Sequence, residues 1–388
     1  MAEQGASIDV LTSSAAGDRP IEPAYNHPFP THFVPGQGLR DVLSSPGATS
    51  FSSATKQQPL FQFFASLRQS FPLHYWTDEG GPTYRRNAYR LAIQLVKERG
   101  ITHLLSSYRP WVDHLIAARL KQRFPKLIWW ADFRDLPIDP VRRDVYLPSL
   151  QTNYAKRIIR AADCILCVSE GQATHLRRLH PNVEVVYAGL TDFPRPTAPQ
   201  TDKFTINYTG SLYPKLQSLG PLKELLPNWL STDKRGYFAV SYAGKDEAIM
   251  ARWLKPYLPA DVLQLEGVID QANARKLQEA ASVNLLLNWS TPSYFGVLTA
   301  KLYDYLSAGR PILAIVNGPD DPELRNIIEG SGAGRVFTVH DEVGIEGWLS
   351  ELFHSWRNTD GKLPWETNRE SLQYLQPQPI LRKLLHET

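Results

Sequence analysis

The sequence predicts an α/β protein with two domains, each built on a parallel β-sheet. Short apolar runs of strand length alternate with segments of helical periodicity along most of the chain, and this alternation is typical of parallel α/β sheets. It stops once, in the proline-rich stretch D-F-P-R-P-T-A-P-Q-T-D at residues 192–202, and then resumes. A chain of 388 residues is long enough to bury two hydrophobic cores.

The first domain is predicted to cover residues 1–191. Its expected strands are Ile8–Thr12, Ile101–Leu105, Leu127–Trp130, Cys164–Val168 and Val183–Tyr187. Its expected helices lie near Thr83–Arg99, Trp111–Phe124, Val145–Ala161 and Glu170–Leu179. Residues 13–60 are rich in Ser, Pro and Gly, and this composition favours a loop.

The second domain is predicted to cover residues 204–363, after a linker at 192–203. Its expected strands are Phe204–Thr209, Phe238–Ala243, Val262–Leu265, Val283–Leu287, Pro311–Ile315 and Arg335–Phe337. Its expected helices lie near Pro221–Leu230, Glu247–Leu258, Gln271–Ala281, Leu298–Ser307, Pro322–Glu329 and Val343–His354. A last helix, near Trp365–His386 in the segment 364–388, is expected to cross back to the first domain.

The composition is that of an ordinary globular protein, with 43% hydrophobic and 21% charged residues. A net charge of +3 gives no reason to expect nucleic-acid binding. No run of eighteen apolar residues and no secretory signal is visible, so we expect a cytoplasmic protein. The two cysteines, Cys164 and Cys167, lie three apart in a predicted strand and therefore point to opposite faces, which disfavours a shared metal or disulfide.

The most informative segment reads Y-F-G-V-L-T-A-K-L-Y-D-Y-L-S-A-G-R-P-I-L and covers residues 294–313. Gly296 precedes a predicted helix, whose first backbone N–H groups are expected to be free to meet an anion. Lys301 and Asp304 follow one helical turn apart. A cation and a carboxylate beside a helix start suit a ligand with a diphosphate and a sugar diol, although a plain surface ion pair has the same pattern.

This segment resembles the donor-binding segment of retaining glycosyltransferases with the two-domain GT-B fold, family 4-like. The first half carries further matches to one branch of that family. These are S-S-Y-R-P-W-V-D-H-L-I-A-A-R-L-K from Ser106, A-D-F-R-D from Ala131, V-S-E-G from Val168 and H-P-N-V-E-V-V-Y-A-G-L from His180. The resemblance covers nearly the whole chain.

The resemblance implies two Rossmann-like domains that face each other across a cleft. It implies transfer of a sugar from a nucleotide diphosphate sugar to a carbohydrate or lipid-linked acceptor. Retention of anomeric configuration and independence of metals follow from it, with the nucleotide sugar as donor substrate and no cofactor. It further implies polysaccharide assembly in the cytoplasm, with possible peripheral contact at the inner face of the membrane and possible homo-oligomers.

The donor site is expected at the carboxyl ends of the second-domain strands. The turn T-G-S-L-Y-P-K would place backbone groups and a cation beside the diphosphate, Val268 and Ile269 would contact the base, and Asp304 would bind the ribose diol. The candidate residues are Gly210, Ser211, Leu212, Tyr213, Lys215, Gly244, Lys245, Val268, Ile269, Gly296, Val297, Leu298, Thr299, Lys301 and Asp304. Lys215 and Ser211 are the candidates for stabilising the leaving diphosphate.

The first domain is expected to shape the acceptor side through Arg134, Asp135, Ser107 and His114. Each of these residues also has a structural alternative. Arg134 and Asp135 would form an ion pair that fixes a loop, and His114 would be a packed or capping histidine. Ser106 and Ser107 would cap the helix that follows them.

Two departures from the family pattern leave alternatives open. Gly296 stands where the first glutamate of the family's Glu-x7-Glu pair is usual, and Asp304 replaces the second. The family's first strand and glycine-rich turn are absent ahead of Ile8, so another segment, a second chain or residues upstream would have to supply them. A non-catalytic or partner-completed nucleotide-sugar binder is therefore one alternative, and a nucleotide-sugar 2-epimerase is another.

The basic residues gather in the first half. By count, residues 1–190 carry about +6 and the rest about −3. Two predicted helices hold the main clusters, Arg85, Arg86, Arg90, Lys97 and Arg99 on the first and Lys121, Arg123 and Lys126 on the next. They form either a solvated helix face or a contact with an anionic membrane or a phosphate-bearing acceptor.

Overall fold

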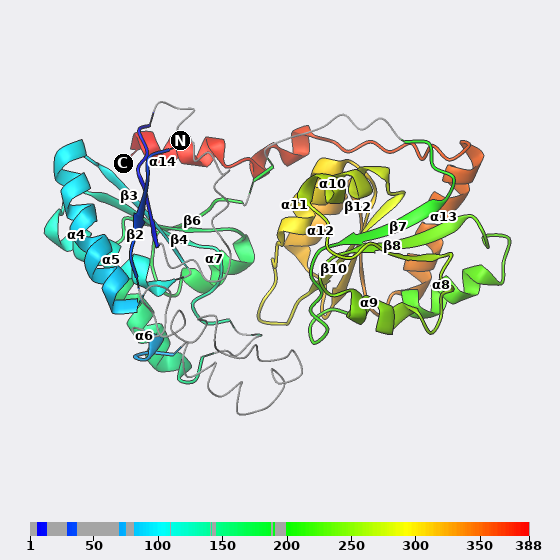
Figure 1. The fold of residues 1–388 in the computed structure, drawn as a ribbon, viewed down its shortest axis with the longest axis horizontal. Coiled ribbons are helices and arrows are strands. Elements are labelled where there is room, and N and C mark those ends of the chain that lie inside the picture. The colour runs from blue at the N-terminus through cyan, green and yellow to red at the C-terminus, as the bar shows by residue number, and fades with distance from the viewer. Residues whose placement is uncertain are drawn as a thin grey trace. The chain divides into compact units, whose positions relative to one another are not determined.

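The computed structural model describes residues 6–13, 29–36, 70–74, 81–108, 110–139, 141, 145–187, 189–190 and 199–387. The chain divides into two compact units (Figure 1). The first unit comprises Met1–Val186 and Ile380–Thr388, and the second comprises Tyr187–Pro379. The chain therefore leaves the first unit, builds the second, and returns to the first. Of the predicted linker, residues 192–198 lie outside the described part.

The second unit is built on a six-stranded parallel sheet with the order β12-β11-β10-β7-β8-β9. Its strands are β7 (Phe204–Thr209), β8 (Phe238–Ala243), β9 (Leu263–Leu265), β10 (Val283–Trp289), β11 (Ile312–Asn317) and β12 (Gly334–Thr338). Its α-helices are α8 (Leu222–Leu230), α9 (Glu247–Leu254), α10 (Gln271–Ala280), α11 (Ala300–Ala308), α12 (Pro322–Gly330) and α13 (Glu342–Asn358).

Both faces of this sheet are covered, which is why its strands are apolar without strict alternation. On one face Leu285 and Leu287 of β10 share a cluster with side chains of α8, α9 and α13. On the other face Leu286 packs with Leu302 and Leu306 of α11 and with residues of α12. This second contact places the amino end of α11 near the carboxyl ends of the strands.

The first unit holds a four-stranded parallel sheet, β3-β4-β5-β6, and a separate parallel pair, β1–β2. The strands are β1 (Val10–Ser13), β2 (Thr31–Val34), β3 (His103–Tyr108), β4 (Ile128–Phe133), β5 (Cys164–Cys167) and β6 (Val183–Val185). The helices are α4 (Gly81–Arg99), α5 (Trp111–Arg123), α6 (Pro148–Ile159) and α7 (Glu170–Leu176). Cys164 and Cys167 are buried and form no disulfide.

Two predictions about elements are wrong. The segment 13–60, expected to be a loop, contains the strand β2, whose Thr31–Val34 backbone pairs in parallel with β1. The single C-terminal helix is instead a 3₁₀ helix, η3 (Glu370–Leu375), followed by α14 (Gln378–Glu387). The break falls where Gln376 adopts an extended conformation before Pro377, because a residue ahead of proline disfavours the helical region.

Helix α14 belongs to the first unit from Ile380 onward. Its Leu384 is buried in a cluster with Trp130 of β4 and with Cys164 and Leu166 of β5. Lys383 adds an exposed contact of 3.3 Å from its Nζ to the Glu184 carboxylate. In the described part of the chain, no helix has both the length and the hydropathy that crossing a bilayer requires.

Candidate functional site

Three glycine turns of the second unit lie side by side at the carboxyl edge of its sheet. The Gly210 N–H, after β7, donates to the Ala243 carbonyl at 2.7 Å, and the Gly244 N–H, after β8, donates to the Gly267 carbonyl at 2.7 Å. A Cβ on Gly244 would lie 2.5 Å from the Gly210 carbonyl oxygen, so only glycine allows this approach. Three of the predicted donor turns are thus brought together.

Two buried tyrosines hold the Gly210 turn in place. The Tyr208 hydroxyl donates to the Ser211 carbonyl at 2.9 Å, and the Tyr242 hydroxyl donates to the Gly210 carbonyl at 3.0 Å. The two rings stack with centroids 6.0 Å apart. Burial raises the pKa of both phenols, which therefore stay protonated donors.

Sequence reasoning missed these tyrosines, although a signal was present. Each stands two positions before its glycine, as Y-T-G at Tyr208 and Y-A-G at Tyr242. Asp246 completes the support of the turn, since its carboxylate accepts the Leu212 N–H at 2.9 Å. The side chains of Tyr208, Tyr242 and Asp246 thus all hold the backbone of this turn through hydrogen bonds.

The hydrogen-bond donors of this turn that have no partner among the described residues are the ones available to an anion. Among the described residues, neither the backbone N–H nor the hydroxyl of Ser211 has a hydrogen-bond partner. Tyr213 is exposed, and its ring lies 5.7 Å from that of Trp289. Lys215 and Lys245 are exposed and form no ion pair within the described part of the chain.

Lys301 is the cation that the structure places against the turn. Its Cε lies 2.9 Å from the position that a Cβ on Gly210 would occupy, and its Nζ lies 5.5 Å from the Tyr208 ring centroid and 6.0 Å from that of Tyr213. Gly210 also has a φ of +103°, in the region that favours glycine. The lysine thus crosses the turn over two aromatic faces.

The charge of Lys301 is set by opposing effects. Burial lowers its pKa, while the carboxylates of Asp304 and Asp246 oppose that shift. Neither carboxylate forms an ion pair with it, and no other described residue does so. The alternative interpretation of this pattern, a surface ion pair between Lys301 and Asp304, is therefore not what the structure shows, and the ammonium group lacks a fixed counter-charge among the described residues.

The segment before α11 differs from prediction at Gly296. Helix α11 begins at Ala300 rather than Leu298, and the buried Gly296 N–H donates to the Asp321 carboxylate at 2.9 Å. It is therefore not free for an anion. Within the described residues, the N–H groups of Val297, Thr299, Ala300 and Lys301 have no hydrogen-bond acceptor and remain at the positive end of α11.

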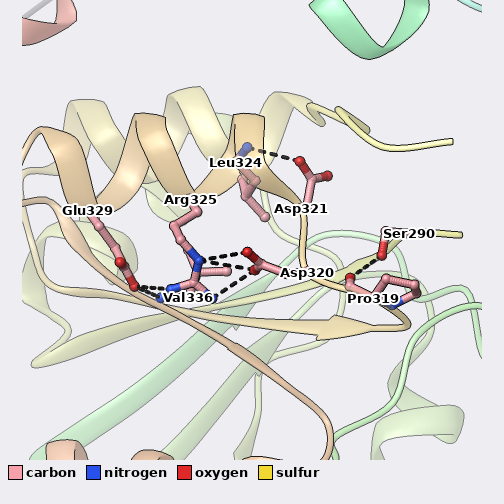
Figure 2. A network of polar contacts seen from close by, with 8 residues as sticks. All are labelled: Ser290, Pro319, Asp320, Asp321, Leu324, Arg325, Glu329 and Val336. Carbon is pink, nitrogen blue, oxygen red and sulfur yellow. Dashed lines mark hydrogen bonds and ion pairs between the residues drawn. The ribbon is translucent and has the colours of Figure 1, made fainter. Parts of the chain in front are cut away.

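Asp321 ties this segment to α12. Its second oxygen accepts the Leu324 N–H at 3.0 Å as the helix cap, and burial raises its pKa while these hydrogen bonds lower it. Figure 2 shows the surrounding network, in which Arg325 bridges the carboxylates of Asp320 and Glu329 and the Ser290 hydroxyl donates to the Pro319 carbonyl. The hydrogen bond from the Gly296 N–H to Asp321 thus ties the loop that leads to α11 to the start of α12.

Asp304 lies on the exposed side of α11, and Arg275 of α10 stands beside it. The Arg275 guanidinium donates to the backbone carbonyls of Asp304 at 3.3 Å and Ser307 at 2.7 Å. Partial burial raises the pKa of the Asp304 carboxyl, and Arg275 and Lys301 oppose the shift. Val268 is exposed and Ile269 half-buried, directly after Gly267 at the same edge.

In the first unit, the carboxyl end of β4 carries a small polar cluster. The Asp132 carboxylate accepts a hydrogen bond from the Ser107 hydroxyl at 2.9 Å. It also forms an ion pair with Arg134, whose Nε lies 3.3 Å from the carboxylate. Arg134 therefore pairs with Asp132 and not with Asp135, which is exposed. Gln172 of α7 fixes the turn by donating to the Arg134 carbonyl at 3.0 Å.

His114 lies in the core of the first unit, with no exposed surface. Its Nδ1 is 2.7 Å from the Ser106 hydroxyl, which also accepts from the Trp129 indole at 2.8 Å. Burial lowers the pKa of His114 to about 3, so the ring is neutral. This arrangement favours the packing interpretation over contact with substrate.

No protein-family model matches the chain, and no curated protein sequence matches it. Several solved structures have a similar fold. Sucrose-phosphate synthase from Thermosynechococcus elongatus is 15% identical over 100% of this chain and 91% of its own, with a TM-score of 0.60. The lipopolysaccharide outer core galactosyltransferase WaaB is 14% identical over 79% of this chain and 81% of its own, with a TM-score of 0.51.

A glycosyltransferase from Rickettsia africae is 12% identical over 80% of this chain and 82% of its own, with a TM-score of 0.50. These structures have the GT-B fold, and this chain shares it, with a parallel sheet in each of two units. The predicted fold class is confirmed. Among the described residues, no three His, Cys, Asp or Glu side chains gather as metal ligands.

Proposed function

We propose that the protein is a glycosyltransferase that moves a sugar from a nucleotide diphosphate sugar to a carbohydrate or lipid-linked acceptor. The observation that carries the proposal is the position of Lys301, which crosses Gly210 at the amino end of α11 and has no ion-pair partner among the described residues. The likeness in fold to solved glycosyltransferases supports the same reaction class.

Transfer of the sugar requires stabilisation of the leaving diphosphate as negative charge builds on it. The Lys301 ammonium, the unpaired Ser211 N–H and the first N–H groups of α11 are the donors at hand in the described part of the chain. Lys215 is exposed beside the same turn and would close on the diphosphate once it is bound. Asp304 would accept the ribose hydroxyls, and Val268 with Ile269 would contact the base.

We place acceptor binding in the first unit, where Ser107, Asp132 and Arg134 form a polar cluster at the end of β4. Asp135 is exposed next to them and completes the set. The proposed mechanism retains anomeric configuration and requires no metal. The acceptor hydroxyl would attack from the face that the phosphate leaves, and the leaving phosphate oxygen would take the hydroxyl proton.

Substitution of the two lysines tests the donor site. We expect Lys301→Ala and Lys215→Ala each to lower turnover by about a hundredfold or more, because a cation that stabilises the transition state is removed. Lys255→Ala, an exposed lysine at the end of α9, should leave turnover unchanged. The measurement is release of nucleoside diphosphate from a panel of UDP-, GDP-, ADP- and dTDP-sugars.

Product analysis without acceptor separates the proposal from its alternatives. A transferase gives slow release of free sugar, and a 2-epimerase gives the epimeric sugar. Tight donor binding by isothermal titration, with no product under any condition, would replace the proposal with a non-catalytic binder. Unchanged turnover in Lys301→Ala would remove that residue from the site.

A further inference from the structure

A basic groove of about 410 Å³ lies among α4, α5 and α6 of the first unit. Four arginines contribute to its lining, and no acidic residue does. The lining residues are Phe71, Arg85, Leu115, Ala118, Arg119, Gln122, Tyr154, Arg157, Ile158, Arg160 and Ala161. Most of these arginines belong to neither basic cluster that the sequence suggested, because α5 and α6 come together only in the fold.

The groove has an apolar floor and a charged rim. Leu115 and Ala118 lie three residues apart on one face of α5, and Ile158 of α6 is buried beside them. Arg157 and Arg160 are exposed and form no ion pair with any described residue. Arg119 is exposed, forms no ion pair with any described residue, and lies over the Tyr89 ring with its guanidinium carbon 4.6 Å from the ring centroid.

An apolar patch adjoins this charge at the other end of α6. Tyr146, Leu147 and Leu150 are 51%, 50% and 46% exposed, three large apolar side chains within five residues. Single exposed apolar residues are ordinary, but a cluster of them marks a contact surface. Leu150 and Arg157 are seven residues apart, so they lie on the same face of α6, two turns from each other.

We propose that this surface docks on a bilayer that contains anionic phospholipids. Arg157, Arg160 and Arg119 would bind head-group phosphates, and Leu147 with Leu150 would enter the interface beside them. A bilayer fits both the arginines and the apolar patch, because a soluble phosphate compound would bind the arginines and leave the apolar patch exposed to water. The proposal stands apart from the sugar-transfer reaction, and its test requires no activity.

The test is co-sedimentation of the full chain with vesicles of phosphatidylcholine alone and of phosphatidylcholine mixed with phosphatidylglycerol. We expect binding to the mixed vesicles to exceed binding to the neutral ones by about tenfold or more. Arg157→Glu with Arg160→Glu should abolish that excess, and Leu147→Ser with Leu150→Ser should weaken binding several-fold. Arg178→Glu, which reverses the charge of one exposed arginine on the turn after α7, is a single-charge control and should bind like the wild type.

Two further arms separate the sources of the signal. Soluble glycerol phosphate should not release the protein from the vesicles, because it cannot replace the apolar contact. Release by glycerol phosphate would overturn the bilayer proposal in favour of a soluble phosphate ligand. Equal binding to both vesicle types, or full binding by the double arginine variant, would overturn it as well, provided that circular dichroism shows every variant folded.

Discussion

At the residue scale, the backbone conformation of Gly210 affects both the stability of the fold and the position of Lys301 in the proposed donor site. Its φ of +103° favours glycine, and a Cβ would lie 2.9 Å from Lys301 Cε. We expect Gly210→Ala to lower the free energy of unfolding by about 1–3 kcal/mol through backbone strain and to displace Lys301. Donor affinity should fall with it, measured by titration of the nucleotide.

A second glycine provides the control for that variant. Gly347 is exposed within α13, and no atom lies within 4 Å of the position that a Cβ would occupy there. Gly347→Ala should raise the free energy of unfolding by about 0.5–1 kcal/mol, because alanine favours the helix. Equal stability of the two variants would contradict the strain argued for Gly210.

His114 predicts how stability depends on pH. Burial lowers its pKa from 6.5 to about 3, so between these values the unfolded chain binds a proton that the folded chain does not. The free energy of unfolding should therefore fall as the pH drops below about 6.5, by up to about 1.4 kcal/mol per pH unit from this residue. Urea unfolding of the wild type and of His114→Gln at several pH values checks the slope.

The variant should show a flatter pH dependence than the wild type, whatever its stability at neutral pH. His354→Gln removes an exposed histidine and should keep the wild-type slope. If His114→Gln also keeps that slope, the ring is not held neutral by burial. His74, whose pKa is lowered to about 4 for the same reason, contributes in the same direction and is present in every variant.

The residues of the donor turn could be named from sequence to the extent that their chemistry is local. Gly210 and Lys301 were predicted from residue type and spacing, and the fold brings them together. Gly296 was assigned to an anion, but its N–H meets Asp321, which lies 25 residues further along the chain. Such a partner is set by tertiary packing, and no spacing rule reveals it.

At the element scale, Asp321 joins the loop before α11 to the start of α12. Asp321→Ala removes two hydrogen bonds to a buried carboxylate, from the Gly296 and Leu324 N–H groups. We expect a loss of about 2–3 kcal/mol in the free energy of unfolding and weaker donor binding, because α11 loses its anchor. Thermal unfolding and nucleotide titration measure the two effects.

Asp341 offers a matched cap outside the site. It is exposed and accepts the Gly344 N–H at 3.0 Å at the start of α13. Asp341→Ala should cost about 1 kcal/mol or less and leave donor binding unchanged. If Asp321→Ala also leaves donor binding unchanged, Asp321 does not position α11 for the donor.

Elements were predictable where their pattern is strong. The strands β7 and β8 begin and end where the sequence predicted, because both are rich in aromatic and β-branched residues and end directly before a glycine. Strand β2 was missed because four residues in a Ser- and Pro-rich stretch give no periodicity, and only pairing with β1 defines them. The break before α14 was missed although Pro377 and Pro379 were visible.

At the scale of the whole molecule, α14 completes the core of the first unit. Leu384→Ala should destabilise that unit by about 2–3 kcal/mol, because a side chain buried against Trp130 and Leu166 is lost. Scanning calorimetry should show one transition moved to lower temperature and the other unmoved. Lys383→Gln should change neither by more than about 0.5 kcal/mol. A shift of both transitions would mean that the units unfold together.

The path of the chain through the two units has a consequence for how they can be produced. The backbone passes from one unit to the other twice, after Val186 and before Ile380. The second unit is a continuous piece and could be expressed alone, whereas a fragment that ends at Val186 would lack the helix that covers β4 and β5. Isolating the first unit therefore calls for grafting residues 380–388 onto it through a short spacer, or for a circular permutant in which α14 comes first.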